Sequence, residues 1–255
     1  MNRLTSTFSQ KPIFMPYFPV GYPNLAASID ILEALAKNGA DLIEVGMSFS
    51  DPLADGPVIQ QATQTALERG VTTRDALSAV AELRRRGVTI PLVLMGYYNP
   101  ILAYGIEKFI HDAAHAGADG FIIPDLPPEE AAEFTALSGS LPLITMLAPT
   151  TPAERMERIA RHAQGFIYLV SVTGVTGARN NLSEGLADLI NRVREHTDVP
   201  VCVGFGISTP EQAQRVGALA DGVIVGSACV REIGASKNPV ETARAFAQKF
   251  KAALR

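Results

Sequence analysis

The sequence predicts a single (β/α)8 barrel, or TIM barrel, that spans residues 1–255 and carries an extra helix at its N-terminus or inserted in the chain. Eight short segments rich in Val, Ile and Leu alternate with helical patterns, which is typical of a parallel sheet covered by helices. Eight is also the number of strands that closes a barrel. A doubly wound open sheet is the alternative, but no G-x-G-x-x-G motif follows the first strand.

Each expected strand is a short apolar run with a Pro or Gly at or next to one of its ends. In chain order the strands cover residues 14–18, 41–46, 91–96, 120–123, 142–147, 166–171, 200–204 and 222–226.

The helical patterns place apolar residues on one face. The first begins after Asn24, a residue type that caps helix N-termini, and stops near Gly39. The other helices are expected at residues 57–68, 74–86, 106–116, 128–137, 152–162, 183–196, 210–219 and 240–253. Two helix-to-strand junctions, 38–41 and 116–119, share the phrase Gly-Ala-Asp, and 220–222 is close to it. Because Gly suits a left-handed helix cap, the phrase predicts a recurring α-to-β turn.

Composition excludes several classes of partner. Lys and Arg total 22 against 26 Asp and Glu, and no basic block stands out, so nucleic acid and anionic membranes are poor candidates. The first eleven residues are polar, unlike a signal peptide, and no apolar run has transmembrane length. Cys202 and Cys229, in or after apolar strands, are expected to be buried thiols in a reducing compartment. The expected location is cytoplasmic.

The most informative stretch runs from Leu42 to Pro57. Side chains alternate along a strand, so Glu44 faces the barrel interior if the neighbouring Ile and Val side chains face the helices. A lone Glu there is costly, and loss of hydration raises its pKa toward the range useful for general acid–base catalysis. Asp51 and Asp55 follow in a turn-rich segment, where position alone slightly favours a capping or turn role. Tyr168, in the sixth strand, is equally consistent with a core aromatic.

Glycine-bearing segments follow the last three strands, at residues 171–179, 204–208 and 226–228. Backbone N–H groups approach a phosphate closely where side chains are absent, and barrels often bind phosphate after strands seven and eight. Each segment alone reads as ordinary turn and capping residues. Together they favour a phosphate site.

Several chemistries lack the residues they need. All lysines lie outside the expected strands, which argues against a Schiff-base or pyridoxal enzyme. None of the four histidines lies at the C-terminal end of a strand, which argues against a metal-dependent aldolase. His111 and His115 are four residues apart on a helix, but no third ligand accompanies them, so no metal is expected. Carboxylate acid–base chemistry on a phosphorylated substrate remains.

The chain resembles the tryptophan synthase α chain family over nearly its whole length. The resemblance rests on Glu44-Val45-Gly46 with Phe49 to Pro57, Tyr97 to Pro100, Asp125-Leu126-Pro127, Gly174-Val175-Thr176-Gly177, Gly204 to Ser208 and Gly226-Ser227-Ala228. The sequence departs from the family at Met47-Ser48, where an aliphatic residue and then proline are expected. This bears on loop geometry and not on the reaction.

The resemblance implies a lyase of tryptophan biosynthesis that cleaves indole-3-glycerol phosphate to indole and glyceraldehyde 3-phosphate. It implies that Glu44 donates and accepts the protons, that Asp55 binds the indole N–H, and that Tyr168 orients Glu44. By their places at strand ends and in loops, the residues expected to surround the indole are Tyr17, Met95, Ile122, Met146 and Thr176. Those expected to hold the phosphate are Gly177, Phe205, Gly206, Gly226 and Ser227.

The family also implies a partner, a β chain that carries pyridoxal phosphate, in an α2β2 heterotetramer; no cofactor is expected on this chain. By position, the expected partner contacts are Asp51, Pro52, Asn99 and Pro100. Three alternatives remain: a stand-alone indole-glycerol-phosphate lyase, a non-catalytic phosphate-binding barrel subunit, and a phosphosugar isomerase. The presence of both Glu44 and Asp55 favours an enzyme over a non-catalytic binding subunit.

Overall fold

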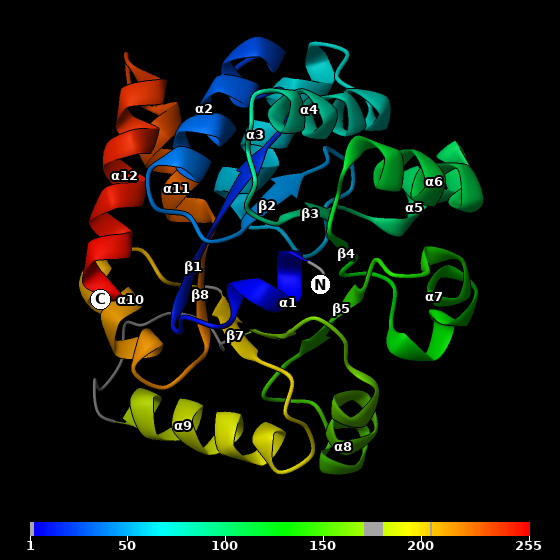
Figure 1. Ribbon diagram of the computed structural model, residues 1–255, viewed down its shortest axis with the longest axis vertical. Coiled ribbons are helices and arrows are strands. Elements are labelled where there is room, and N and C mark those ends of the chain that lie inside the picture. Colours follow the sequence, from blue (N-terminus) through cyan, green and yellow to red (C-terminus); the bar gives the residue numbers. More distant parts are fainter. Residues whose placement is uncertain (1–2, 171–180, 205) are drawn as a thin grey trace.

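A computed structural model describes residues 3–170, 181–204 and 206–255 of the chain (Figure 1). In this part of the chain eight parallel strands form a closed barrel, in which each strand pairs with the next and β8 pairs with β1. The strands are β1 (Ile13–Pro19), β2 (Ile43–Gly46), β3 (Leu92–Met95), β4 (Gly120–Ile122), β5 (Leu143–Leu147), β6 (Ile167–Val170), β7 (Val201–Gly204) and β8 (Gly222–Val225).

Helices surround the barrel (Figure 1). They are α1 (Arg3–Thr7), α2 (Leu25–Lys37), α3 (Pro57–Glu68), α4 (Thr73–Arg85), α5 (Tyr98–Tyr104), α6 (Ile106–Ala116), the 3-10 helix η1 (Pro128–Glu130), α7 (Ala132–Ser138), α8 (Ala153–His162), α9 (Asn181–Arg194), α10 (Pro210–Gly217), α11 (Ser227–Gly234) and α12 (Pro239–Ala253). No helix among the described ranges combines the length and hydropathy needed to cross a membrane.

The predicted fold class is confirmed, and the extra helices include α1 at the N-terminus and a second helix after each of β2 (α3 and α4), β3 (α5 and α6) and β8 (α11 and α12). The bounds of α3 and α6 match the expectation, and Asn24 caps α2 by accepting the N–H of Ala27 at 2.9 Å. The helix expected at 128–137 is instead η1 followed by α7. One helix that is not among those expected, α5, begins at Tyr98 and has Pro100 in its first turn, where a missing N–H costs nothing.

The outer face of the barrel packs on aromatic side chains. Phe14 of β1 stacks on Phe250 of α12 with ring centroids 5.5 Å apart. On the other side Phe121 of β4 contacts Phe109 and Phe134 at 5.6 and 5.2 Å. All five of the rings in this description are fully buried, so the helices that cover these strands are held by apolar contact.

The recurring Asp of the α-to-β turns binds the neighbouring strand at the N-terminal end of the barrel. The carboxylates of Asp41, Asp119 and Asp221 accept backbone N–H groups from Phe14, Leu92 and Val201, at 2.7, 2.8 and 2.9 Å. We call these contacts the Asp–amide bonds. They join β1 to β2, β3 to β4 and β7 to β8, and the predicted turn is therefore confirmed, with Gly39 and Gly117 at φ +135° and +90°.

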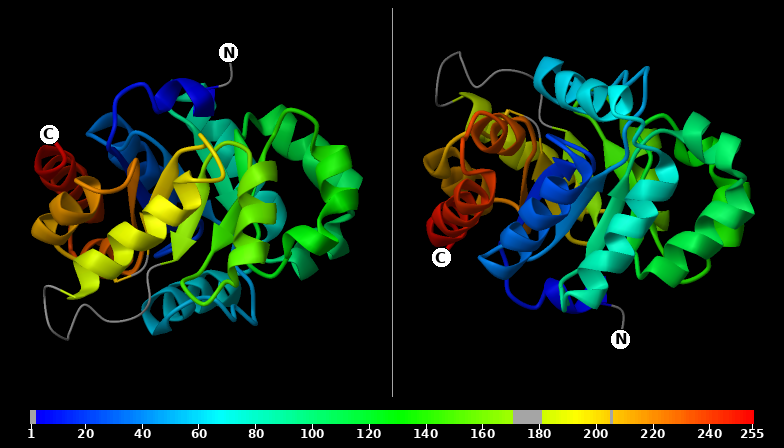
Figure 2. Two further views of the ribbon diagram at one scale, coloured as in Figure 1. Left: turned by 90° about the horizontal axis from the view of Figure 1, so that it is seen from below. Right: turned by 90° about the horizontal axis from the view of Figure 1, so that it is seen from above.

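Basic side chains complete this end of the barrel. Arg84 and Arg3 pair with Asp119, Lys251 pairs with Asp41, and Lys11 and Arg194 pair with Asp221. Figure 2 shows α1, which carries Arg3, at one end of the barrel and α3 at the opposite end. The N-terminal helix thus closes the end away from the strands' C-terminal ends.

The pair β5–β6 differs from the other three pairs. Gly165 stands two residues before β6, where Asp41 stands two residues before β2. A side chain at Gly165 would come within 2.9 Å of Leu4 and Ile144, and the residue has φ +70°. There is no space for a carboxylate at this position.

Candidate active site

A cavity of about 460 Å³ opens at the C-terminal ends of the strands. It is lined by residues from β1, β2, β3, β6 and β8, by the segment before α3, and by the first turns of α11. Five of the predicted residues, Tyr17, Glu44, Asp55, Met95 and Tyr168, lie together on its wall.

Glu44 is the most deeply placed acid of the cavity. Its side chain is 1% exposed, and its Oε1 atom has no hydrogen-bond partner among the residues that the structure describes. Burial, and secondly the nearby charge of Asp55, raise the pKa of Glu44 to about 8. The carboxyl group is therefore protonated at neutral pH, and it lies on the wall of the cavity.

Asp55 lies in the segment between β2 and α3 and has a different environment. Its Oδ2 atom accepts a hydrogen bond from the Tyr97 hydroxyl at 3.0 Å, and the same hydroxyl oxygen accepts the N–H of Ala54 at 3.0 Å. Burial raises the pKa of Asp55 to about 6, although the Tyr97 hydrogen bond opposes the shift. At neutral pH Asp55 is ionised while Glu44 is not.

Two tyrosines fill the barrel on either side of Glu44. Tyr17 lies beside Glu44 in the β1–β2 register, and Tyr168 comes from β6. Burial raises the pKa of each hydroxyl well above its usual value, and the charges of Glu44 and Asp55 add to this. Glycines provide the space: a Cβ atom at Gly46 or Gly204 would lie 2.4 Å from the Tyr17 or Tyr168 hydroxyl oxygen, respectively.

The opposite wall of the cavity carries backbone amides and one cation. Gly206, Gly226 and Ser227, three of the residues predicted to hold a phosphate, line the cavity, and Ser227 begins α11, whose first N–H groups have no partner within the helix. Arg231, one turn further along α11, lines the same wall. This wall has the groups that a phosphate needs.

The other residues predicted to bind the substrate fall into two groups. Thr176, Gly177 and Phe205 lie outside the described residues. Ile122 is fully buried in β4 without reaching the cavity wall, and Met146 lines a second groove.

The predicted partner contacts lie on two adjacent segments. Asp51 and Asn99 are exposed, and Pro52 and Pro100 are half-buried. Beside them the structure exposes two leucines, Leu53 (89%) and Leu102 (48%). The segments are held together because Tyr97 contacts the Phe49 ring at 5.5 Å, in addition to its bond with Ala54.

Sequence reasoning assigned no role to Tyr97 or Arg231. Tyr97 had been recognised only as a residue at a strand end, and its partner Asp55 is 42 residues away. Arg231 gives a weak signal: it is a cation four residues after Ser227 in a short helix that follows the last strand.

The fold and this cavity define a class: a (β/α)8-barrel enzyme with two carboxyl groups of different ionisation beside an anion-binding wall. The model of the family described as tryptophan synthase alpha chain matches residues 5–255. The chain belongs to the tryptophan synthase alpha chain family.

Similar proteins match this chain over almost its whole length. A tryptophan synthase alpha chain of Chloroflexus aggregans is 53% identical over 237 residues, 90% of this chain and 89% of the relative. That of Roseiflexus castenholzii is 49% identical, covering 96% and 97% of the two chains. Among solved structures, tryptophan synthase from M. tuberculosis in its aminoacrylate-bound form gives a TM-score of 0.89 at 36% identity, covering both chains completely. The alpha subunit from Legionella pneumophila gives 0.90 at 37% identity, covering 100% of this chain and 98% of that chain.

The activity follows from the family. The enzyme is a lyase that cleaves indole-3-glycerol phosphate in tryptophan synthesis, as the sequence predicted. The alpha chain of the family needs no cofactor, because the pyridoxal phosphate resides on the beta chain. The isomerase and the non-catalytic subunit are therefore set aside.

Proposed function

We propose that Glu44 is the general acid and general base of the cleavage. The observation that carries this proposal is its buried, unpartnered Oε1 atom on the wall of the cavity. Since the pKa of Glu44 is raised to about 8, the group holds a proton at neutral pH and can donate it.

The proton goes to the ring carbon of indole that bears the glycerol chain. This forms an indolenine whose positive nitrogen can accept an electron pair. The carboxylate left on Glu44 then removes the proton of the adjacent glycerol hydroxyl, the carbon–carbon bond breaks, and its electrons neutralise the indolenine. The products are indole and glyceraldehyde 3-phosphate, and Glu44 ends protonated as it began.

Asp55 has the complementary role. Its pKa of about 6 leaves it ionised at neutral pH, so it accepts a hydrogen bond from the indole N–H as positive charge develops on that nitrogen. Tyr97 is a positioning residue, since its hydroxyl donates to Asp55 while the Ala54 N–H fixes the hydroxyl oxygen. Tyr168, which is buried in β6 on the wall of the same cavity, orients the carboxyl group of Glu44.

The substrate phosphate binds at the wall formed by Gly206, Gly226 and Ser227. Amides at the start of α11 favour an anion, and Arg231 on the same helix supplies a guanidinium. This placement lays the indole toward Asp55 and the glycerol chain across Glu44.

The chain acts with a beta chain in an α2β2 heterotetramer. Solved neighbours of this chain are tryptophan synthases, including the aminoacrylate-bound form from M. tuberculosis. Leu53 and Leu102 expose large apolar surface next to Asp51, Pro52, Asn99 and Pro100, near the mouth of the cavity. Apolar side chains exposed together are typical of an interaction site.

The test is indole release from indole-3-glycerol phosphate by the Glu44→Gln variant, with and without a beta chain. We expect the turnover to fall by about 10²- to 10⁴-fold, because proton transfer is lost while shape is kept. Glu107→Gln, an exposed position on α6, serves as the matched control. A Glu44→Gln variant that kept more than a tenth of the rate would refute the assignment. Fast release by the unmodified chain alone, unchanged by a beta chain, would instead favour a stand-alone lyase.

A further inference from the structure

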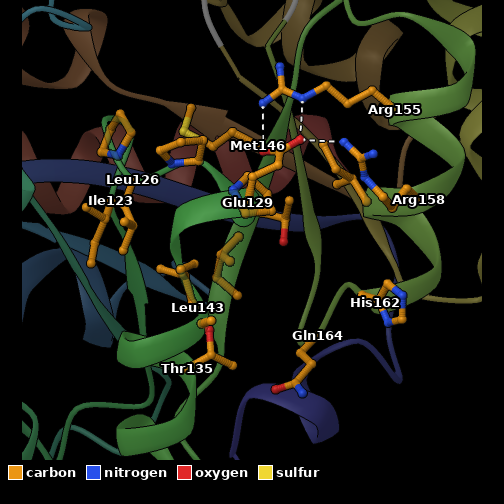
Figure 3. A pocket seen from close by; sticks show the side chains of 18 of the residues that line it. Ile123, Leu126, Glu129, Thr135, Leu143, Met146, Arg155, Arg158, His162 and Gln164 are labelled. Atoms are coloured by element: carbon orange, nitrogen blue, oxygen red, sulfur yellow. Dashed lines mark hydrogen bonds and ion pairs between the residues drawn. The ribbon is translucent and has the colours of Figure 1, made fainter.

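The strand β5 is covered less completely than its neighbours. Among the described strands it alone has partly exposed residues in its middle. Met146 pairs with Tyr168 and shares its inward side, whereas Thr145 lies on the outer face that the helices cover. The helices on either side, α7 and α8, leave a groove of about 910 Å³ over this strand (Figure 3). This volume lies within the range of small-molecule sites.

The groove has an apolar body. Ile123, Leu126 and Leu143 line it, and α7 presents the small residues Ala132 and Ala136, one turn apart. The groove and the catalytic cavity have no lining residue in common, so the groove is a separate place on the outside of the barrel.

One end of the groove is cationic. Arg155 binds Glu129 through two contacts, at 2.9 and 3.1 Å, and Arg158 binds the same carboxylate at 2.8 Å (Figure 3). Two guanidinium groups thus face a single carboxylate, and these contacts use a minority of their N–H donors. His162 adds a further titratable nitrogen on the α8 side.

The Glu129 contact also indicates which anion fits. The two arginines already hold a planar carboxylate, one of them through both oxygens, and this fork geometry suits a carboxylate in particular. The side chains of Arg155 and Arg158 are 42% and 57% exposed, so a ligand can reach them from solvent.

We propose that the groove between α7 and α8 binds an aromatic monocarboxylate, with the ring on the apolar floor of β5 and α7 and the carboxylate on Arg155 and Arg158. The net positive charge attracts the anion, and the apolar floor selects ligands that carry a ring.

The probe is 1-naphthylacetate, followed by its fluorescence anisotropy on titration with the full chain. The sequence contains no tryptophan, so protein emission interferes little. We expect saturable binding, and we expect the uncharged 1-naphthylacetamide to bind at least tenfold more weakly. Equal binding of acid and amide would overturn the proposal, since the arginines would then contribute nothing.

Two groove variants and one control variant test whether the probe binds in the groove. Replacing Arg155 and Arg158 together by Gln is expected to weaken binding at least tenfold, and Ala136→Phe is expected to block it sterically. The control is Arg161→Gln, because Arg161 lies on the same helix, pairs with Glu157 and is not part of the groove lining. Loss of binding in the Arg161 variant, or its persistence in both groove variants, would refute the site.

A competition experiment distinguishes probe binding in the groove from probe binding in the catalytic cavity. Saturating glycerol 3-phosphate is expected to leave probe binding unchanged. Displacement of the probe would place it in the catalytic cavity and overturn the proposal. The proposal would also be overturned if the beta chain covered the groove and the isolated chain did not bind the probe.

Discussion

The two ends of the barrel use buried carboxylates in opposite ways. At the N-terminal end, Asp119 receives the Leu92 N–H and the side chains of Arg3 and Arg84. At the C-terminal end, Glu44 is as deeply buried, yet one of its oxygens has no partner among the described residues. The first arrangement holds a charge in place, and the second keeps a proton available.

The pKa values of the buried carboxyl groups at the two ends of the barrel differ in the same way. Burial raises the pKa of Asp221, but the Val201 N–H, Lys11 and Arg194 outweigh this effect and lower it. Burial raises the pKa of Glu44 to about 8, with nothing cationic among its causes to oppose the shift. The supply of donors, and not depth of burial, therefore separates the lowered pKa of Asp221 from the raised pKa of Glu44.

After Glu44, the largest expected effect concerns Asp55. In the Asp55→Asn variant we expect turnover to fall by about 10²- to 10³-fold, since one preorganised group that stabilises charge in the transition state is lost. Stability is expected to stay the same or rise. Steady-state kinetics on indole-3-glycerol phosphate and urea unfolding measure the two effects. A variant with weaker binding and intact turnover would contradict the role.

The Asp119→Asn variant is expected to show the reverse of Asp55→Asn: lower stability with nearly unchanged turnover. Asp119→Asn breaks a buried ion pair and leaves Arg84 without its carboxylate, which costs about 3 kcal/mol of unfolding free energy. Turnover of the folded variant is expected to change less than twofold. Urea unfolding of the variant, compared with Glu107→Gln at an exposed position on α6, checks this. If turnover fell with stability, the two ends would not be independent.

The pH dependence of stability sharpens the contrast. The pKa of Glu44 is about 8 in the folded chain and near 4.5 when unfolded, so the unfolded state binds fewer protons between these values. The folded chain therefore loses stability as pH rises through this window, by at most about 1.4 kcal/mol per pH unit. Glu44→Gln removes this term, and we expect the variant to gain about 2 kcal/mol over the native chain between about pH 6 and 7.5. Parallel stability curves for the two chains would contradict the assignment.

Tyr97 tests the positioning of Asp55 with the smallest effect. Tyr97→Phe removes one hydrogen bond to a carboxylate, and we expect turnover to fall about tenfold, equivalent to about 1.4 kcal/mol, with KM little changed. Because this hydrogen bond lowers the pKa of Asp55, its loss raises that pKa above about 6. The acidic limb of the rate profile should then move to higher pH. A purely structural role would leave the profile in place.

Much of the fold was predictable because alternation of apolar strands and helices is a local signal. The helix α5 was missed because Tyr98-Asn99-Pro100 has the composition of a turn. Glu44 could be proposed as a catalytic candidate from the residues alone, since a Glu inside an apolar strand is unusual. Asp55 could not, because an Asp among Pro and Gly is ordinary, and the family resemblance had to supply its role.

Other features depend on contacts that sequence spacing does not reveal. The partner of Asp55, Tyr97, follows a different strand, and the amide that Asp119 accepts belongs to a strand 27 residues earlier. The phrase Gly-Ala-Asp predicted the turn, but only the barrel register shows what its carboxylate binds.

The Asp–amide bonds also show where the chain can be divided. A cut between α7 and β5 leaves each of these bonds within one fragment, whereas several ion pairs join the two fragments: Lys251 with Asp41, Lys11 with Asp221, and Arg155 and Arg158 with Glu129. Glu44 and Asp55 would belong to the first fragment. Tyr168 and the cavity wall formed by Gly206, Gly226 and Ser227 would belong to the second. Half-barrels made as separate polypeptides would therefore each keep their own strand pairs, recognise one another through opposite charges, and become active only on reassembly.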